Sequence, residues 1–257
     1  MTWKEKNLSA LVVAVLTFLS VLGAALLGLF SKTRLPSEQL RDDTSSVVRL
    51  VVNLFVVMTS LLLGLMMNSA KNSLETNNRN IRTLATELIL LDRTMRALGP
   101  ETEDARRHLV EYVQTTLNKW HGNPLEADPH QEASLEAAGT SLRAIRVPDE
   151  QKVTWEGARD LYRQIVRQRW VLVDASGGTI PTPLIIMLIL WVVFIFAGFG
   201  YGAPRNTIVT ASFFLAALLI SAALYLIVDM DTPSTGIFEP IQVSNAPFQR
   251  ALTELQR

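Results

Sequence analysis

Four long apolar stretches alternate with polar segments along the chain. They cover residues 11–30, 47–67, 183–200 and 208–228, and they contain almost no charged side chains. A helix of about 20 apolar residues crosses the roughly 30 Å hydrocarbon core of a bilayer. Backbone groups in lipid must find hydrogen-bond partners within their own segment. The pattern therefore predicts four transmembrane helices, two on either side of a polar insert.

The polar insert has a helical pattern of its own. Apolar residues continue past the second stretch at Ile81, Leu84, Leu88, Leu91, Met95 and Leu98. Their spacing of three and four is typical of one buried helix face, and Gly99-Pro100 follows as a helix stop. No later segment shows the alternation typical of a strand. The helices predicted lie near 8–31, 46–98, 101–121, 131–146, 149–174, 182–200, 206–229 and 247–256.

Basic residues near the membrane segments set the expected orientation, because cytoplasmic loops are enriched in Lys and Arg. With four crossings, both termini and the insert share one side. That side carries Lys4, Lys6, Lys71, Arg79, Arg82, Arg163, Arg167 and Arg169, and the other carries Lys32, Arg34, Arg41 and Arg205. The first apolar run is longer than the apolar core of a signal peptide, which has roughly 7–15 residues. We therefore expect it to remain uncleaved as a membrane anchor.

The predicted fold class is all-α: a polytopic membrane protein with four transmembrane helices and a helical cytoplasmic insert between the second and third. We expect a multi-pass protein of the cell (inner) membrane, with both termini and the insert in the cytoplasm. Its expected parts are a first helix pair (1–71), the insert (72–179), a second helix pair (180–230) and a cytoplasmic C-terminal tail (231–257).

Composition excludes several classes of function. The 24 acidic and 24 basic residues cancel, so no net field favours nucleic acid as a partner. The chain has no cysteine, which removes thiolate metal sites and a cysteine nucleophile. His108, His121 and His130 lack the spacing of a zinc site, and neither a Gly-x-Ser-x-Gly elbow nor a Walker-type loop is present. No enzymatic activity is predicted.

One helical face of the second stretch is polar or small. This stripe consists of Arg49, Asn53, Val57, Ser60, Gly64, Asn68, Lys71 and Glu75, and Asn78 and Arg82 continue it in phase. Polar groups at membrane depth are costly unless they face protein or water. The stripe therefore suits the wall of an aqueous pore. In the alternative interpretation, Asn53 and Ser60 form hydrogen bonds to neighbouring helices.

An acidic turn follows the fourth stretch, with Asp229 and Asp231 at the helix end and Glu239 farther on. Carboxylate and carbonyl oxygens are ligands of the kind that Ca²⁺ prefers, although the spacing is not that of an EF-hand. In the alternative, a basic side chain such as Arg79 or Arg82 compensates the acids, because the macrodipole disfavours negative charge at a helix C-terminus.

Small residues recur at intervals of four in two of the apolar stretches. The pairs are Ala24-xxx-Gly28, Ser212-xxx-Ala216 and Ala217-xxx-Ser221. Small residues let membrane helices approach closely. The sequence leaves open whether these contacts lie within one subunit or between subunits.

The layout of two helices, an insert and two more helices resembles the bestrophin-like domain family of bacterial membrane proteins. The motifs that carry the resemblance are Tyr201-Gly-Ala-Pro-Arg-Asn206 and Asp229-Met-Asp-Thr-Pro-Ser-Thr-Gly236. Bestrophins are homopentameric ion channels whose second helices line the pore, and an acidic turn binds calcium in animal members. The resemblance implies that residues 53–68 line a pore and that Asp229, Asp231 and Glu239 form the acidic turn.

This chain departs from the animal channels in two ways. Phe55 stands off the stripe, so the aromatic-rich neck has no clear match, and the run of consecutive acids is absent. The function predicted is a homo-oligomeric ion channel in membrane lipid, with five subunits favoured and four or six as alternatives. Arg49, Lys71 and Arg82 favour anions, whereas Glu75 is compatible with cations. The competing function is a non-conducting sensor or scaffold whose insert binds a protein partner.

Overall fold

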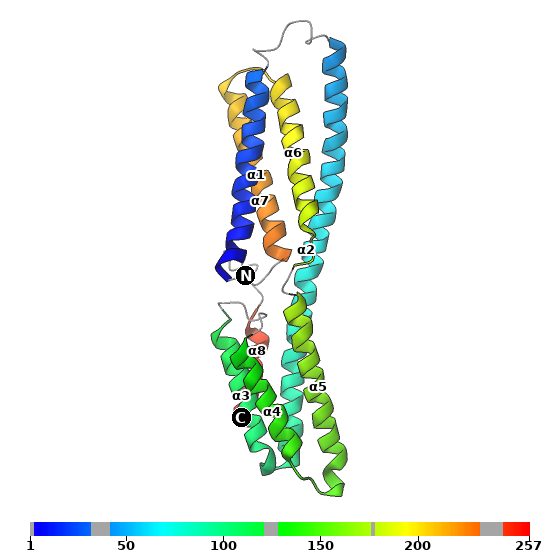
Figure 1. Cartoon of the computed structure of the whole chain (residues 1–257), viewed down its shortest axis with the longest axis vertical. Helices are drawn as coiled ribbons and strands as arrows, with labels where there is room; N and C mark the ends of the chain where they lie inside the picture. The colour runs from blue at the N-terminus through cyan, green and yellow to red at the C-terminus, as the bar shows by residue number, and fades with distance from the viewer. Residues whose placement is uncertain (1–2, 32–41, 121–127, 176–177, 232–243) are drawn as a thin grey trace. The chain divides into compact units, whose positions relative to one another are not determined.

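The computed structural model describes residues 3–31, 42–120, 128–175, 178–231 and 244–257, and its regular elements are helices (Figure 1). In chain order they are α1 (Trp3–Ser31), α2 (Asp42–Leu98), η2 (Pro100–Thr102), α3 (Glu103–Asn118), α4 (Pro129–Ala144), η3 (Asp149–Gln151), α5 (Lys152–Ala175), α6 (Thr182–Gly202), α7 (Thr207–Asp231) and α8 (Ala246–Leu255). The part of the chain described contains no strand, and the all-α fold class is confirmed.

Within the described residues, α1, α2, α6 and α7 contain the segments long and apolar enough to cross a membrane. The chain divides into two compact units. The membrane unit comprises Met1–Asn72 and Thr179–Asp231, and the insert unit comprises Ser73–Gly178 and Thr232–Arg257. The continuous helix α2 contributes its first part to the membrane unit and its second part to the insert unit.

In the membrane unit, α1 and α6 lie side by side (Figure 1). They approach each other closely at two glycines. A Cβ atom on Gly28 would collide with the carbonyl oxygen of Ala197, and one on Gly200 would collide with that of Ala25. Gly28 belongs to the small-residue pair of the first stretch, so that pair brings helices together within one subunit.

The helix α7 also packs against α1. Ala217 and Ser221 are buried, and Ser221 Oγ donates a hydrogen bond of 2.6 Å to the carbonyl oxygen of Ala14. The pair Ala217-xxx-Ser221 is therefore also a contact within the subunit. Ser212, in contrast, is exposed, and its hydroxyl bonds the carbonyl oxygen of Ile208 in its own helix.

Aromatic and small residues join α2 to α6. The Phe55 ring lies 5.0 Å from the ring of Phe194 and 5.9 Å from that of Trp191, between centroids. The buried side chain of Val52 fills the space beside Gly198, where a Cβ would collide with it. Phe55 thus stands off the polar stripe because it anchors α2 to its own subunit.

The insert unit is built around the second part of α2. Its core contains all six predicted apolar positions of that segment, Ile81, Leu84, Leu88, Leu91, Met95 and Leu98. Gly99 has a φ of 97°, a left-handed conformation that favours glycine, and it ends α2 as predicted. Phe248, Ala251 and Leu255 bring α8 into the same core.

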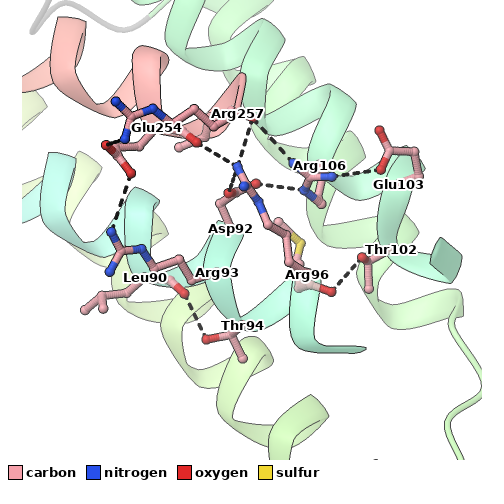
Figure 2. A network of polar contacts seen from close by, with 12 residues as sticks. Leu90, Asp92, Arg93, Thr94, Arg96, Thr102, Glu103, Arg106, Glu254 and Arg257 are labelled. Atoms are coloured by element: carbon pink, nitrogen blue, oxygen red, sulfur yellow. Dashed lines mark hydrogen bonds and ion pairs between the residues drawn. The ribbon is translucent and has the colours of Figure 1, made fainter. Parts of the chain in front are cut away.

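A buried carboxylate joins α2 to α3 in the insert unit (Figure 2). The Asp92 side chain is 2% exposed and bonds Arg96 at 2.7 Å and Arg106 at 2.8 Å. Burial lowers the pKa of Arg106, but its hydrogen bonds and ion pairs with Asp92 and Glu103 outweigh that effect and raise the pKa above its usual value. The arginine therefore stays charged.

The same network fixes the end of α8 (Figure 2). Arg96 donates a hydrogen bond of 2.6 Å to the carbonyl oxygen of Glu254 and one of 3.3 Å to that of Leu255. Arg93 reaches the Glu254 carboxylate at 3.5 Å. The last carbonyls of a helix have no partner within it and carry partial negative charge, so these arginines stabilise the α8 terminus.

Candidate functional site

One face of α2 is buried against its own membrane unit. Val52, Thr59, Met66 and Ala70 are the buried side chains of this segment. Residues three, four and seven apart share a helical face, so the opposite side of α2 points away from the subunit.

All eight residues predicted to line a pore are exposed in the single subunit. They are Arg49, Asn53, Val57, Ser60, Gly64, Asn68, Lys71 and Glu75. The Ser60 hydroxyl donates to the carbonyl oxygen of Val56 at 2.8 Å, within its own helix. A Cβ on Gly64 would meet nothing within 4 Å. The alternative in which Asn53 and Ser60 bond neighbouring helices of the same subunit does not occur among the described residues.

A second exposed strip lies beside the polar stripe. Leu50, Leu54, Leu61 and Leu65 are 72%, 57%, 66% and 68% exposed. Because successive residues are about 100° apart around a helix, these leucines lie on the face directly next to the polar stripe. The sequence pattern predicts apolar residues opposite the stripe but does not separate those buried in the subunit from these exposed leucines. The free side of α2 therefore has a polar half and an apolar half.

The first turns of the stripe border a pocket of about 330 Å³ between α2 and the end of α6. Arg49 and Asn53 line it from α2, and Phe199 and Tyr201 line it from α6. Its only cationic lining residue within the described chain is Arg49. Arg49 and Asn53 thus belong both to the stripe and to the wall of this pocket.

The motif of residues 201–206 begins in the last turn of α6 and reaches the start of α7. Arg205 donates hydrogen bonds to the carbonyl oxygens of Leu29 at 3.2 Å and of Phe30 at 3.1 Å, and its guanidinium lies 5.2 Å from the centre of the Phe30 ring. Asn206 Oδ1 accepts from the N–H of Val209 at 2.8 Å and so supports the first turn of α7. Arg205 thus ties the link between α6 and α7 to the end of α1, whereas Asn206 caps α7.

At its other end the stripe reaches Lys71 and Glu75, both exposed. Glu75 pairs with Arg79 one turn on, at 3.7 Å, on an exposed surface. The basic side chains of Lys71 and Arg79 therefore each lie about one helical turn from the acidic side chain of Glu75.

The acidic turn has a structural partner that the sequence did not indicate. Both oxygens of the buried Asp231 accept hydrogen bonds of 2.9 Å from the N–H of Thr179, and one also accepts from the N–H of Ile180. Backbone N–H groups therefore compensate the charge of Asp231, and an ion pair with Arg79 or Arg82 stays a prediction. Asp229 is also buried, and its Oδ2 has no hydrogen-bond partner among the described residues.

A calcium site stays a prediction for this turn. Glu239 lies outside the described residues, and the described part contains no group of three or more His, Cys, Asp or Glu that could hold a metal. Ca²⁺ takes about six to eight oxygen ligands, and Asp231 already uses its oxygens for backbone N–H groups. The described residues do not by themselves fit the ion.

The helices and their apolar surfaces define a polytopic membrane protein. The chain belongs to a family within that class: residues 11–248 match the bestrophin-like domain, so it is a bestrophin-like domain protein. No curated protein matches the sequence.

Solved structures share the fold. One is a bacterial bestrophin homologue from Klebsiella pneumoniae with a point mutation, with a TM-score of 0.61, 14% identity and coverage of 94% of this chain and 97% of that one. The same homologue, phased on zinc, gives a TM-score of 0.59 at 14% identity, with 94% and 96% coverage. A structure described as a membrane protein has a TM-score of 0.59 at 15% identity and covers 94% of this chain and 96% of its own.

Proposed function

We propose that the chain is one subunit of a closed homo-oligomeric ion channel whose pore is lined by α2. The single observation that carries this proposal is the stripe on α2: all eight of its residues are exposed, although five of them, residues 49–64, lie within or beside a membrane-length apolar segment. Polar groups at that depth are costly in lipid and are accommodated beside water. Membership of the bestrophin-like family, whose bestrophins are ion channels, supports the same function.

The leucine strip gives the oligomer its proposed contacts. Placing the polar stripe at a symmetry axis turns Leu50, Leu54, Leu61 and Leu65 toward a neighbouring subunit at the side of the pore. Cyclic symmetry repeats one such contact around the ring and closes it. Asn53, Ser60 and Asn68 then form rings of neutral polar groups along the path.

The charges at the two ends of the stripe bear on ion selectivity. Rings of basic side chains favour anions, and acidic rings favour cations. Arg49 and Lys71 contribute positive rings and Glu75 a negative one. A reversal potential measured in a salt gradient distinguishes the two. We also propose that the insert and both termini face the cytoplasm, as the distribution of basic residues indicates.

The test is current across planar bilayers that contain the purified full chain. Ser60→Leu and Gly64→Leu narrow and dry the proposed path, because hydrophobic constrictions stop conduction by dewetting. Both variants are expected to lower the current at least about tenfold.

Ser212→Leu is the matched control. Ser212 is also an exposed membrane-helix serine whose hydroxyl bonds the carbonyl four residues before it, but it lies on α7. Its current is expected to equal that of the unchanged protein. Equal losses in all three variants, or no current from a correctly assembled oligomer, contradict the proposed pore and favour the non-conducting scaffold.

A further inference from the structure

A larger pocket lies in the insert unit, between the second part of α2 and the start of α8. Its volume is about 610 Å³, within the roughly 300–1,000 Å³ common for small-molecule sites. Asn78, Arg82 and Thr86 line it from α2, and Ser244 and Arg250 line it from the other side. We call it the two-arginine pocket.

The charge of this pocket is one-sided. Arg82 and Arg250 are its only charged lining residues within the described chain, and both side chains are exposed. Neither guanidinium forms an ion pair with a described residue, whereas many arginines of the same unit do. Those paired with a carboxylate are Arg79, Arg93, Arg96, Arg106, Arg107, Arg163 and Arg257. Among the described residues, the pocket therefore holds two positive charges and no negative group.

The neutral polar groups of the pocket can donate hydrogen bonds as well. Asn78 brings an amide N–H₂. Ser244 Oγ accepts from the N–H of Ala246 at 3.3 Å, which leaves its own proton to donate. Thr86 uses its proton on the carbonyl oxygen of Arg82, at 2.9 Å, and so is not counted as a donor. The polar part of the lining thus offers mainly hydrogen-bond donors, and the complement of that part is a group rich in acceptor oxygens.

We propose that the two-arginine pocket binds a phosphate group carried by a small anion. A guanidinium presents a planar fork that matches two phosphate oxygens, and charge-assisted bonds of this kind are among the stronger hydrogen bonds in proteins. Two such forks match the two negative charges of a phosphate, and the volume leaves room for the rest of the molecule. The site lies within the insert unit and does not depend on whether α2 lines a pore.

Titration calorimetry of the purified full chain, in mild detergent and at constant ionic strength, tests the site with inorganic pyrophosphate as the probe. Saturable binding is expected. Arg82→Gln and Arg250→Gln should each weaken it by at least about tenfold, as expected for a lost hydrogen bond between charged groups. Arg107→Gln, which removes one exposed arginine of the same unit that pairs with Asp104, should leave it unchanged.

Two further arms make the result specific. In the first, mixed micelles that contain phosphatidic acid are added as a competitor of pyrophosphate. Competition identifies a lipid headgroup as the source of the phosphate, and absence of competition identifies a soluble phosphorylated molecule. Arg82→Lys and Arg250→Lys keep the charge and the fold but lose the fork, so several-fold weaker binding is expected. No saturable binding of pyrophosphate or phosphatidic acid, equal weakening by Arg107→Gln, or unchanged affinity in both lysine variants would overturn the proposal.

Discussion

Asp231 closes α7 and also fixes the segment that leads into α6. Its carboxylate accepts hydrogen bonds from the N–H groups of Thr179 and Ile180, which stand before the first turn of α6 at Thr182. A negative charge at that position also complements the positive end of the α6 dipole. The same side chain that raised the question of a cation is thus held by the protein's own backbone.

Asp231→Ala is expected to destabilise the protein by about 1–3 kcal/mol, because two part-buried N–H groups lose their acceptor. Asp231→Asn should cost less, since its amide oxygen still accepts. Thermal unfolding of the detergent-purified protein measures both, with and without calcium. A ligand that binds only the folded state raises the melting temperature, so a calcium-dependent rise that Asp231→Ala abolishes would contradict the structural role.

The second residue with a large expected effect is Asp92. Asp92→Asn leaves Arg96 and Arg106 without their shared carboxylate, and breaking a buried pair typically costs about 3–5 kcal/mol. Because Arg96 is one-third exposed, we expect about 3 kcal/mol or less. Chemical unfolding followed by circular dichroism measures the loss.

Asp160→Asn is the matched control for Asp92. Asp160 pairs with Arg163 on an exposed face of α5, and exposed pairs contribute about 0–1 kcal/mol. An Asp92 variant no less stable than the Asp160 variant would show that the network of Figure 2 does not hold α2, α3 and α8 together.

At the scale of elements, the crossing of α1 and α6 depends on the absence of a Cβ. Gly28→Ala is expected to destabilise the membrane unit by about 1–3 kcal/mol, because the added methyl group collides with the α6 backbone. Gly23→Ala, on the same helix, meets nothing within 4 Å and should be neutral or slightly stabilising. The melting temperatures of the two variants test this. Equal changes in both would show that helix propensity, and not the close contact of α1 with α6, determines the effect on stability.

Local patterns explain how much of these elements could be predicted. The spacing of Ile81 to Leu98 and the stop at Gly99 depend on neighbours within a few residues, and the structure has both as expected. The partners of Asp231 and the contact of Arg96 with Glu254 connect residues 52 and 158 positions apart. No periodicity encodes such pairings. The leucine strip was missed for a related reason: composition alone does not separate an apolar face buried in the subunit from an exposed one.

At the scale of the whole molecule, the free side of α2 predicts association. The protein in mild detergent is expected to form a single closed oligomer, about five times the 28.6 kDa subunit by family resemblance. Light scattering coupled to size exclusion, or native mass spectrometry, gives the number of subunits. Four or six would revise the symmetry and keep the proposed pore. A monodisperse monomer would contradict it, since one α2 cannot enclose a path.

The polar stripe also has a consequence before any ring has formed. A newly inserted subunit presents the amides of Asn53 and Asn68 on the exposed face of α2, where acyl chains offer them no hydrogen bond. In the proposed oligomer the same amides meet water, so each association step removes a penalty that a lone subunit bears. The lifetime of an orphan subunit should therefore depend on how densely the membrane is populated with its partners, and surplus copies become early substrates for membrane proteases.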